Sequence, residues 1–476
     1  MTIQVQQVSF FRLPMQTRFP FRYGIASLTH LPHLIVKADV EIDGTLVRGF
    51  SSDGLAPKWF TKNPDTTFEQ DDLPAMLSVI RHAAESAVDV GCRSSFFDWW
   101  KAIYDAQTTW AFQESQPPLL AGFGVSLLER AVMDAFCRAR QATLHQVLHS
   151  NLAEIDLGAV RKTAGGVQPC DILPAQPRAS IRMRHTVGLG DPLTASDVNS
   201  HNRPQDQLPF TLEENIQRYG LTHFKIKLGG DFEIDHARLL TIAEILGRHD
   251  QQRVRFTLDG NENYHNISVF RDHWGRHRST PTLRSFFDQA LLFVEQPLHR
   301  DHALLDEVRE ELESWPDAPE IIIDESDADF SSLPRALELG YSGTSHKNCK
   351  GLIKGLANAA TITAEQNNGR AAVLSAEDLG NVGPLALTQD LAMAACLNVS
   401  HIERNGHHYF AGLSQFPKQE QHRTRQVFAG LYISTSDGFP GLHISDGLLN
   451  LNSVNASAFG DTRTPDSTLF ERWELC

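Results

Sequence analysis

The first fifty residues alternate apolar and polar side chains, which is the pattern of β-strands that bury one face. The alternation is clearest at residues 3–11 (IQVQQVSFF) and 33–50 (HLIVKADVEIDGTLVRGF), and an Asp-Gly pair inside the second stretch is a hairpin-turn signal. Apolar residues then recur three and four positions apart at 71–88 and 123–148, which predicts amphipathic helices. The pattern therefore predicts an α+β domain over residues 1–150.

From about residue 180 the pattern changes to short, mostly apolar strands that alternate with helical segments. Strands of this kind indicate a parallel sheet that helices cover on both faces. We count eight: 180–189, 223–228, 254–259, 291–297, 320–326, 343–348, 371–378 and 400–404. Eight strands favour a closed β/α barrel over an open sheet, here within residues 151–410. The turn-rich stretch 411–476 is expected to pack back on the first domain.

Charged residues end five successive strands of this series: Lys227, Asp259, Glu295, Asp324 and Lys347. Their separations are 32, 36, 29 and 23 residues, each about one strand-plus-helix unit of roughly 30 residues. In a β/α barrel the C-terminal strand ends converge on one mouth, where charged residues are typically catalytic. Side chains two apart on a strand share a face, so Lys225 is expected to point the same way as Lys227.

Three carboxylates without histidine or cysteine form a hard-oxygen site, which suits Mg²⁺, or Mn²⁺ as an alternative, better than zinc. The predicted ligands are Asp259, Glu295 and Asp324. A lysine beside such a cation and partly removed from water should have a lowered pKa, so that a neutral amine is available as a base. This combination suits removal of the α-proton of a carboxylate, because the cation stabilises the enediolate that forms.

The same residues resemble the motifs of the enolase superfamily, and within it the mandelate racemase/muconate lactonizing enzyme-like family, muconate lactonizing enzyme subgroup. The resemblance is carried by K-x-K at Lys225 and Lys227, D-x-N at Asp259 and Asn261, E-Q-P at Glu295 to Pro297, D-E-S at Asp324 to Ser326, and Lys347 on the next strand. A lysine base combined with Mg²⁺ is a known property of that superfamily. The resemblance implies a modified (β/α)7β TIM barrel with an N-terminal α+β capping domain, and covers most of the chain.

The resemblance also implies a role for each residue. Lys227 and Lys347 would be acid/base groups on opposite faces of the substrate, Lys225 would support Lys227 electrostatically, and the three carboxylates would bind Mg²⁺. Glu377 and Asp378 lie near the end of the seventh strand, and their role stays open. Two lysines on opposite faces favour 1,1-proton transfer, so racemase or epimerase is the first hypothesis. Cycloisomerase and acid-sugar dehydratase are alternatives within the superfamily.

Two further alternatives come from other classes. A desolvated lysine can attack a carbonyl, so a Schiff-base lyase on the same fold is one of them. A barrel that binds without catalysing is the other, because each short motif alone is also an ordinary strand or turn pattern.

The composition limits the classes of molecule that the protein is expected to bind. The formal net charge of -15 over 476 residues disfavours nucleic acid and anionic membrane surfaces, and we find no local basic cluster, so the expected partner is a small-molecule carboxylate. Homo-oligomers are expected by the resemblance. The six cysteines lie far apart, and the N-terminus has neither a secretory pattern nor an apolar run of about 20 residues. This is typical of reduced thiols in a cytoplasmic protein.

Overall fold

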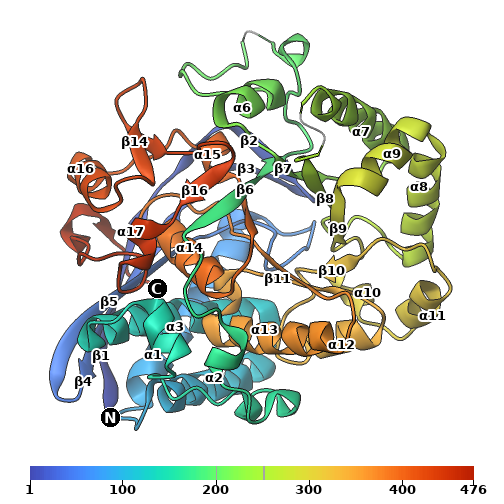
Figure 1. The fold of residues 1–476 in the computed structure, drawn as a ribbon. Coiled ribbons are helices and arrows are strands. Elements are labelled where there is room, and N and C mark those ends of the chain that lie inside the picture. Colours follow the sequence, from blue (N-terminus) through green and yellow to red (C-terminus); the bar gives the residue numbers. More distant parts are fainter. Residues whose placement is uncertain (200, 250–251, 476) are drawn as a thin grey trace.

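The computed structural model describes residues 1–199, 201–249 and 252–475, and it places an antiparallel sheet with helices beside a barrel of parallel strands (Figure 1). The antiparallel sheet has the strand order β17-β1-β4-β5. Its strands are β1 (Ile3–Leu13), β4 (His33–Ile42), β5 (Thr45–Gly54) and β17 (Glu471–Arg472). A separate hairpin is formed by β2 (Gln16–Tyr23) and β3 (Ala26–His30). The alternation of apolar residues in the first fifty positions thus predicts this part of the fold correctly.

Helices cover one side of this sheet: α1 (Leu73–Asp89), α2 (Phe96–Gln113), α3 (Pro118–Arg140) and α4 (Leu144–His149). The chain starts α2 at Ser95, whose hydroxyl accepts the N–H of Asp98, and it starts α3 with a proline in the first turn. Helix α3 is buried along most of its length and packs on β5. The approach is so close that a Cβ at Gly49 would lie 1.9 Å from the carbonyl oxygen of Ala131. Only glycine fits there.

Eight parallel strands form the closed barrel, because the last strand, β13, pairs with the first, β6. The strands are β6 (Ser180–Val187), β7 (His223–Lys227), β8 (Arg255–Asp259), β9 (Leu291–Glu295), β10 (Ile321–Ile323), β11 (Gly343–His346), β12 (Val373–Ala376) and β13 (His401–Arg404). Every strand segment that the sequence predicts contains one of them. The predicted fold, an α/β barrel with an N-terminal α+β cap, is confirmed.

Helices of the second part follow the strands in chain order and lie outside the barrel (Figure 1). They are α5 (Pro169–Ile172), α6 (Leu212–Tyr219), α7 (Phe232–Gly247), α8 (Ile267–Ser279), α9 (Pro281–Ala290), α10 (Arg300–Ala303), α11 (Glu307–Glu313), α12 (Ser332–Glu338), α13 (Leu352–Asn367) and α14 (Ala386–Cys396). One hydrophobic cluster extends from the sheet and its helices into the barrel, so the two parts share a core.

A buried carboxylate also joins the two parts. Glu129 on α3 accepts the N–H groups of Leu352, at 2.9 Å, and Ile353, at 2.8 Å, and so satisfies two free donors at the start of α13. Burial raises the pKa of Glu129 to about 7, although these two hydrogen bonds lower it. The first turn of α13 follows Lys347 by only a few residues, so α3 fixes the chain next to a predicted site residue.

The segment after β13 wraps back over both parts. Its elements are α15 (Gly406–Tyr409), α16 (Lys418–Val427), β14 (Tyr432–Ser434), β15 (Pro440–Leu442), β16 (Leu448–Asn450) and α17 (Asn452–Asn455). Strand β16 adds to the barrel antiparallel to β6, and β17 pairs with β1 at Phe11 and Arg12.

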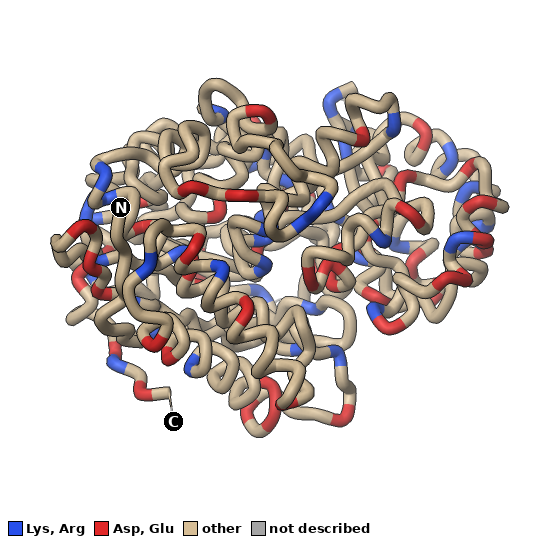
Figure 2. The backbone as a smooth tube through the Cα atoms, turned by 90° about the horizontal axis from the view of Figure 1, so that it is seen from below, with Lys and Arg blue, Asp and Glu red and all other residues tan. Residues whose placement is uncertain are grey.

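Acidic and basic residues alternate around the molecule (Figure 2). Within the described part of the chain, no helix combines the length and the apolar character needed to cross a membrane. The five described cysteines are all free, while Cys476 lies outside the described residues.

Candidate active site

The predicted site residues lie at the C-terminal ends of neighbouring barrel strands. Strand pairing sets Lys227 beside Asp259, and Asp259 beside Glu295. Asp324 directly follows β10 and Lys347 directly follows β11. All five side chains are buried, at 6% exposure or less. The structure therefore brings together, at one mouth of the barrel, residues that are far apart in the sequence.

Lys225 lies at the centre of this cluster and does not point outward like an ordinary strand lysine. Its Nζ is 2.6 Å from Glu377, 2.9 Å from Glu295, 3.0 Å from Asp259 and 3.2 Å from Glu403. The ammonium group thus bridges carboxylates from four different strands. The two lysines on one face of β7 differ in depth, since Lys225 lies deep in the barrel and Lys227 lies nearer its mouth.

Lys227 and Lys347 pair with different carboxylates of the cluster. Lys227 Nζ is 2.5 Å from Asp259 Oδ2. Lys347 Nζ is 2.5 Å from Asp324 Oδ2 and 2.9 Å from Glu377 Oε2, and it also lies 5.2 Å from the ring centre of Trp59. Both lysines line the same small cavity at the barrel mouth. The two amines could therefore contact one bound molecule.

Several members of the cluster are not predicted from the sequence. Glu377 follows β12 and bonds Lys225, Lys347 and also Arg184 on β6. Glu403 on β13 accepts from Thr186 at 2.5 Å. Lys350 donates to Asp324 Oδ1 at 2.9 Å. A sequence signal for Glu377 is present, because an acidic residue ends the seventh strand, but two adjacent acids leave the choice open. Glu403 likewise lies near the end of β13, whereas Arg184 lies in the middle of β6.

The residues fit a divalent cation, judged by the donor set and by one unsatisfied group. Oxygen atoms of Glu295, Asp324 and Glu377 lie within 4.8 Å of one another. Neither carboxylate oxygen of Glu295 accepts a hydrogen bond from the described residues, although Lys225 Nζ approaches one of them. Three buried carboxylates with spare lone pairs suit Mg²⁺ or Mn²⁺. The predicted ligand Asp259 lies outside this trio. Lys227 and the N–H of Asn261 engage its oxygens, as lysines also engage Asp324 and Glu377.

Charge in the cluster sets the protonation of the lysines. Burial lowers the pKa of Lys347, but Asp324 and Glu377 outweigh burial and raise it well above its usual value. Burial and the neighbouring Glu377 raise the pKa of Glu295 well above its usual value. The carboxylates alone therefore stabilise the ammonium form of Lys347. The expected lowering of the lysine pKa beside a bound cation stays a prediction. A lowered value needs the opposing charge of a cation among these carboxylates.

The cap covers the barrel mouth and leaves a small cavity beneath it. Phe21 and Tyr23 from the β2–β3 hairpin and Trp59 from the segment after β5 line a cavity of about 40 Å³ together with Lys227 and Lys347. That volume is much smaller than the cavity of about 150 Å³ that can bind benzene.

Arg300 holds the segment after β5 in this closed position. Its guanidinium donates to the carbonyl oxygens of Phe60, at 2.8 Å, and Trp59, at 2.9 Å, and pairs with Glu262 at 2.8 Å. A nearby second contact joins Lys62 to the carbonyl oxygen of Asn261. These contacts tie one cap segment to the loops after β8 and β9.

Comparisons with known proteins agree with this architecture. Residues 210–442 match the family model described as enolase C-terminal domain-like. No curated protein matches the chain. Among solved structures, a dipeptide epimerase from Enterococcus faecalis V583, complexed with Mg and the dipeptide L-Leu-L-Tyr, is 15% identical, with 95% of this chain and 99% of that chain covered and a TM-score of 0.59.

Two other solved structures are similar. A mandelate racemase/muconate lactonizing protein from Herpetosiphon aurantiacus is 17% identical, with coverage of 95% and 97% and a TM-score of 0.58. An N-succinyl Arg/Lys racemase from Bacillus cereus ATCC 14579 is 15% identical, with coverage of 95% and 97% and a TM-score of 0.57. At these identities the likeness establishes a common fold over nearly the whole chain.

Proposed function

We propose that the chain is an enolase-superfamily enzyme that removes the α-proton of a carboxylate substrate with a lysine base beside Mg²⁺. The family match covers residues 210–442, which include seven of the eight barrel strands. One observation carries the proposal: Lys227 and Lys347 face one closed cavity, and each pairs with a different carboxylate of the same cluster. An amine on each side of a bound acid is what proton removal and return require.

The three lysines and the cap each have a task in the proposed reaction. Lys227 or Lys347 takes the α-proton on its Nζ, and the other returns a proton to the opposite face. Lys225 holds the carboxylates of four strands together and supports Lys227 electrostatically. The cap excludes water, so that the charges around the substrate act in a medium of low dielectric constant. Mg²⁺, when bound, would supply positive charge that stabilises the enediolate of the substrate.

The cation would be held by Asp259, Glu295 and Asp324, and Glu377 is a fourth candidate ligand. The oxygens of Glu377 cluster with those of Glu295 and Asp324, whereas Asp259 lies outside that cluster. Mn²⁺ binding measured by electron paramagnetic resonance distinguishes these ligands without an activity assay. We expect Glu295→Gln to abolish binding. Comparison of Asp259→Asn with Glu377→Gln then identifies the third ligand, because its loss weakens binding more.

We favour racemisation or epimerisation as the outcome. Two amines on different sides of one cavity allow 1,1-proton transfer, whereas elimination or cycloisomerisation needs only one base in the proton-removal step. The similar structures include an epimerase of dipeptides and a racemase of N-succinyl amino acids. N-acylated amino acids and dipeptides are therefore the first substrates to try, followed by acid sugars. Cycloisomerase and acid-sugar dehydratase stay alternatives.

The test is exchange of the substrate α-hydrogen in D₂O, followed by NMR, with Mg²⁺ and with EDTA. We expect Mg²⁺-dependent exchange, with inversion of configuration for at least one member of the panel. In Lys227→Gln and Lys347→Gln, exchange of one enantiomer should fall by about 10² to 10⁴-fold while the other enantiomer still exchanges. Lys101→Gln, at an exposed ion pair, is the matched control. Equal effects of both site substitutions on both enantiomers would contradict a two-base mechanism.

The competing classes give different results in the same experiments. A Schiff-base lyase would be trapped by borohydride in the presence of an aldehyde or ketone and would keep its activity in EDTA. A non-catalytic barrel would show no exchange with any acid, and the two lysine substitutions would leave ligand affinity unchanged.

A further inference from the structure

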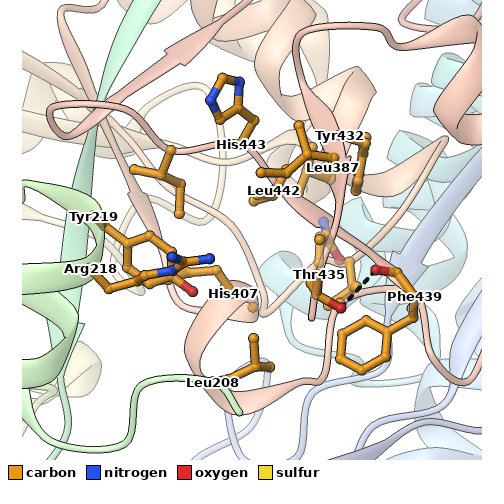
Figure 3. Close-up of a pocket in the computed structure, with 17 residues that line it drawn as sticks. Leu208, Arg218, Tyr219, Leu387, His407, Tyr432, Thr435, Phe439, Leu442 and His443 are labelled. Atoms are coloured by element: carbon orange, nitrogen blue, oxygen red, sulfur yellow. Dashed lines mark hydrogen bonds between the residues drawn. The ribbon is translucent and has the colours of Figure 1, made fainter. Parts of the chain in front are cut away.

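A second pocket lies behind the wall of the barrel mouth, between the barrel and the segment that follows β13. It has a volume of about 240 Å³. Figure 3 shows Arg218, Tyr219 and His407 on one side of it, and Thr435 and Phe439 on the other. Its walls come from the end of α6, from α15 and from the β14–β15 hairpin. The barrel-mouth cavity and this pocket have no lining residue in common.

The walls are largely apolar, and two buried polar atoms in them, His407 Nδ1 and Tyr432 Oη, lack a hydrogen-bond partner among the described residues. His407 is 8% exposed, and its Nδ1 makes no hydrogen bond with the described residues. The other ring nitrogen is engaged, since His407 Nε2 lies 2.9 Å from His185 Nδ1. A buried polar atom without a partner costs free energy, and native structures satisfy most such atoms. A ligand in the pocket would give His407 Nδ1 a hydrogen-bond partner.

A cationic side chain belongs to the same lining. Arg218 is exposed at the end of α6, and its guanidinium makes no hydrogen bond or ion pair with the described residues. Burial keeps the neighbouring His407 ring neutral, because it lowers the pKa of that ring well below its usual value. A neutral ring with its proton on Nδ1 donates to an anion, and a guanidinium binds a carboxylate through two parallel N–H groups.

The size and the polarity of the pocket limit the ligand. An apolar cavity of about 150 Å³ can bind benzene, so 240 Å³ accommodates a ring or a branched chain with a short acidic arm. Leu387 and Leu442 supply apolar surface for such a body. The lining offers one cationic side chain, Arg218, which balances a single negative charge. The pocket therefore suits an amphipathic monoanion.

We propose that this pocket binds a small aromatic or branched aliphatic carboxylate, with its acid group on Arg218 and His407 and its apolar body against the leucine-lined wall. The site is separate from the barrel mouth and is coupled to it. Asn381 and Gly406 line the pocket, whereas the preceding residues Gly380 and Asn405 line the barrel-mouth cavity. A ligand would thus hold, from behind, two segments that form the wall of the active site.

The proposal is tested by binding, with no need for an activity assay. The probe is 4-fluorophenylacetate, titrated into the full chain in EDTA and followed by ¹⁹F NMR, with 4-fluorophenylacetamide as its uncharged analogue. We expect the acid to bind at least about tenfold more tightly than the amide, because a charge-assisted bidentate contact is stronger than a neutral one. Arg218→Gln should bring the acid to the affinity of the amide, while Leu208→Trp should block both, since Leu208 lines the pocket.

Two controls separate binding in this pocket from nonspecific attraction to surface arginines and from binding at the barrel mouth. Arg309→Gln removes an exposed arginine on α11 and should leave binding unchanged. The double variant Lys227→Met/Lys347→Met alters the barrel mouth and should also bind the acid normally. The proposal is overturned if acid and amide bind alike, if Arg218→Gln binds as the wild type does, or if the double-lysine variant alone loses binding. Absence of any binding up to millimolar probe overturns it as well.

Discussion

Replacing Lys225 with methionine tests whether one ammonium group holds the barrel mouth together. Its Nζ lies 2.6 to 3.2 Å from Glu377, Glu295, Asp259 and Glu403. At an effective dielectric constant of about 20, a pair of charges about 3 Å apart attracts by roughly 6 kcal/mol before the cost of desolvation. Removal of one partner from a buried pair costs about 3 to 5 kcal/mol, because the other charge stays buried. We expect a loss of that size from the free energy of unfolding.

The loss should depend on pH in a defined direction. Burial raises the pKa of Glu377, but Lys225 is the first of the charges that outweigh burial and lower it. Without Lys225 the carboxylates of the folded protein have higher pKa values, so they bind protons that the unfolded chain does not bind. Stability then falls as the pH rises through that range. The difference between variant and wild type should therefore be larger at pH 8 than at pH 5.

The assay is urea unfolding at both pH values, in EDTA and in Mg²⁺. Mg²⁺ should restore part of the loss at pH 8, because the cation replaces the missing positive charge among the same carboxylates. Lys101→Met breaks the exposed pair with Asp105 and should cost less than about 1 kcal/mol at either pH. A variant at Lys225 that unfolds like the wild type at pH 8 in EDTA would refute the reasoning, and so would a larger loss at pH 5.

Two further predictions concern stability away from the site. Burial lowers the pKa of His33 to about 4, from a reference near 6.5. The free energy of unfolding should therefore fall by up to about 3 kcal/mol as the pH falls from 6.5 to 4. In urea unfolding, His33→Gln should flatten this part of the stability curve, whereas the exposed control His443→Gln should not. Gly49→Ala would bring a Cβ within 1.9 Å of the Ala131 carbonyl oxygen and should lower the free energy of unfolding by about 3 kcal/mol or more. The control Gly122→Ala, whose Cβ would have no atom within 4 Å, should be neutral or stabilising. An equal shift of the melting temperature in both variants would contradict the close packing of β5 on α3.

The barrel was predictable because its strands are short, apolar and regularly spaced, and because the charged residues end them. Lys227, Asp259 and Glu295 could be placed side by side from sequence, since each is the last residue of its strand. Strand pairing alone then brings them together. The fold and the inner half of the site follow from this local rule.

The remaining parts depend on contacts that no local pattern encodes. Arg184 lies in the middle of β6, where a charged residue is typical of a solvent-facing position, yet its partner Glu377 lies across the barrel after β12. The raised pKa of Lys347 has a related origin, because it depends on the carboxylates of other strands that surround its amine. Arg300 holds cap carbonyls of Trp59 and Phe60 from a position some 240 residues away in the chain. Such long-range pairs appear only in three dimensions.

The small cavity at the barrel mouth has a consequence for the rate of turnover. A space of about 40 Å³ is too small for an acid of the size of benzene, which needs a cavity of about 150 Å³, so substrate enters and product leaves only when the cap opens. Each lifting breaks the bonds of Arg300 to the cap carbonyls. The rate of this opening is then an upper limit on the turnover number.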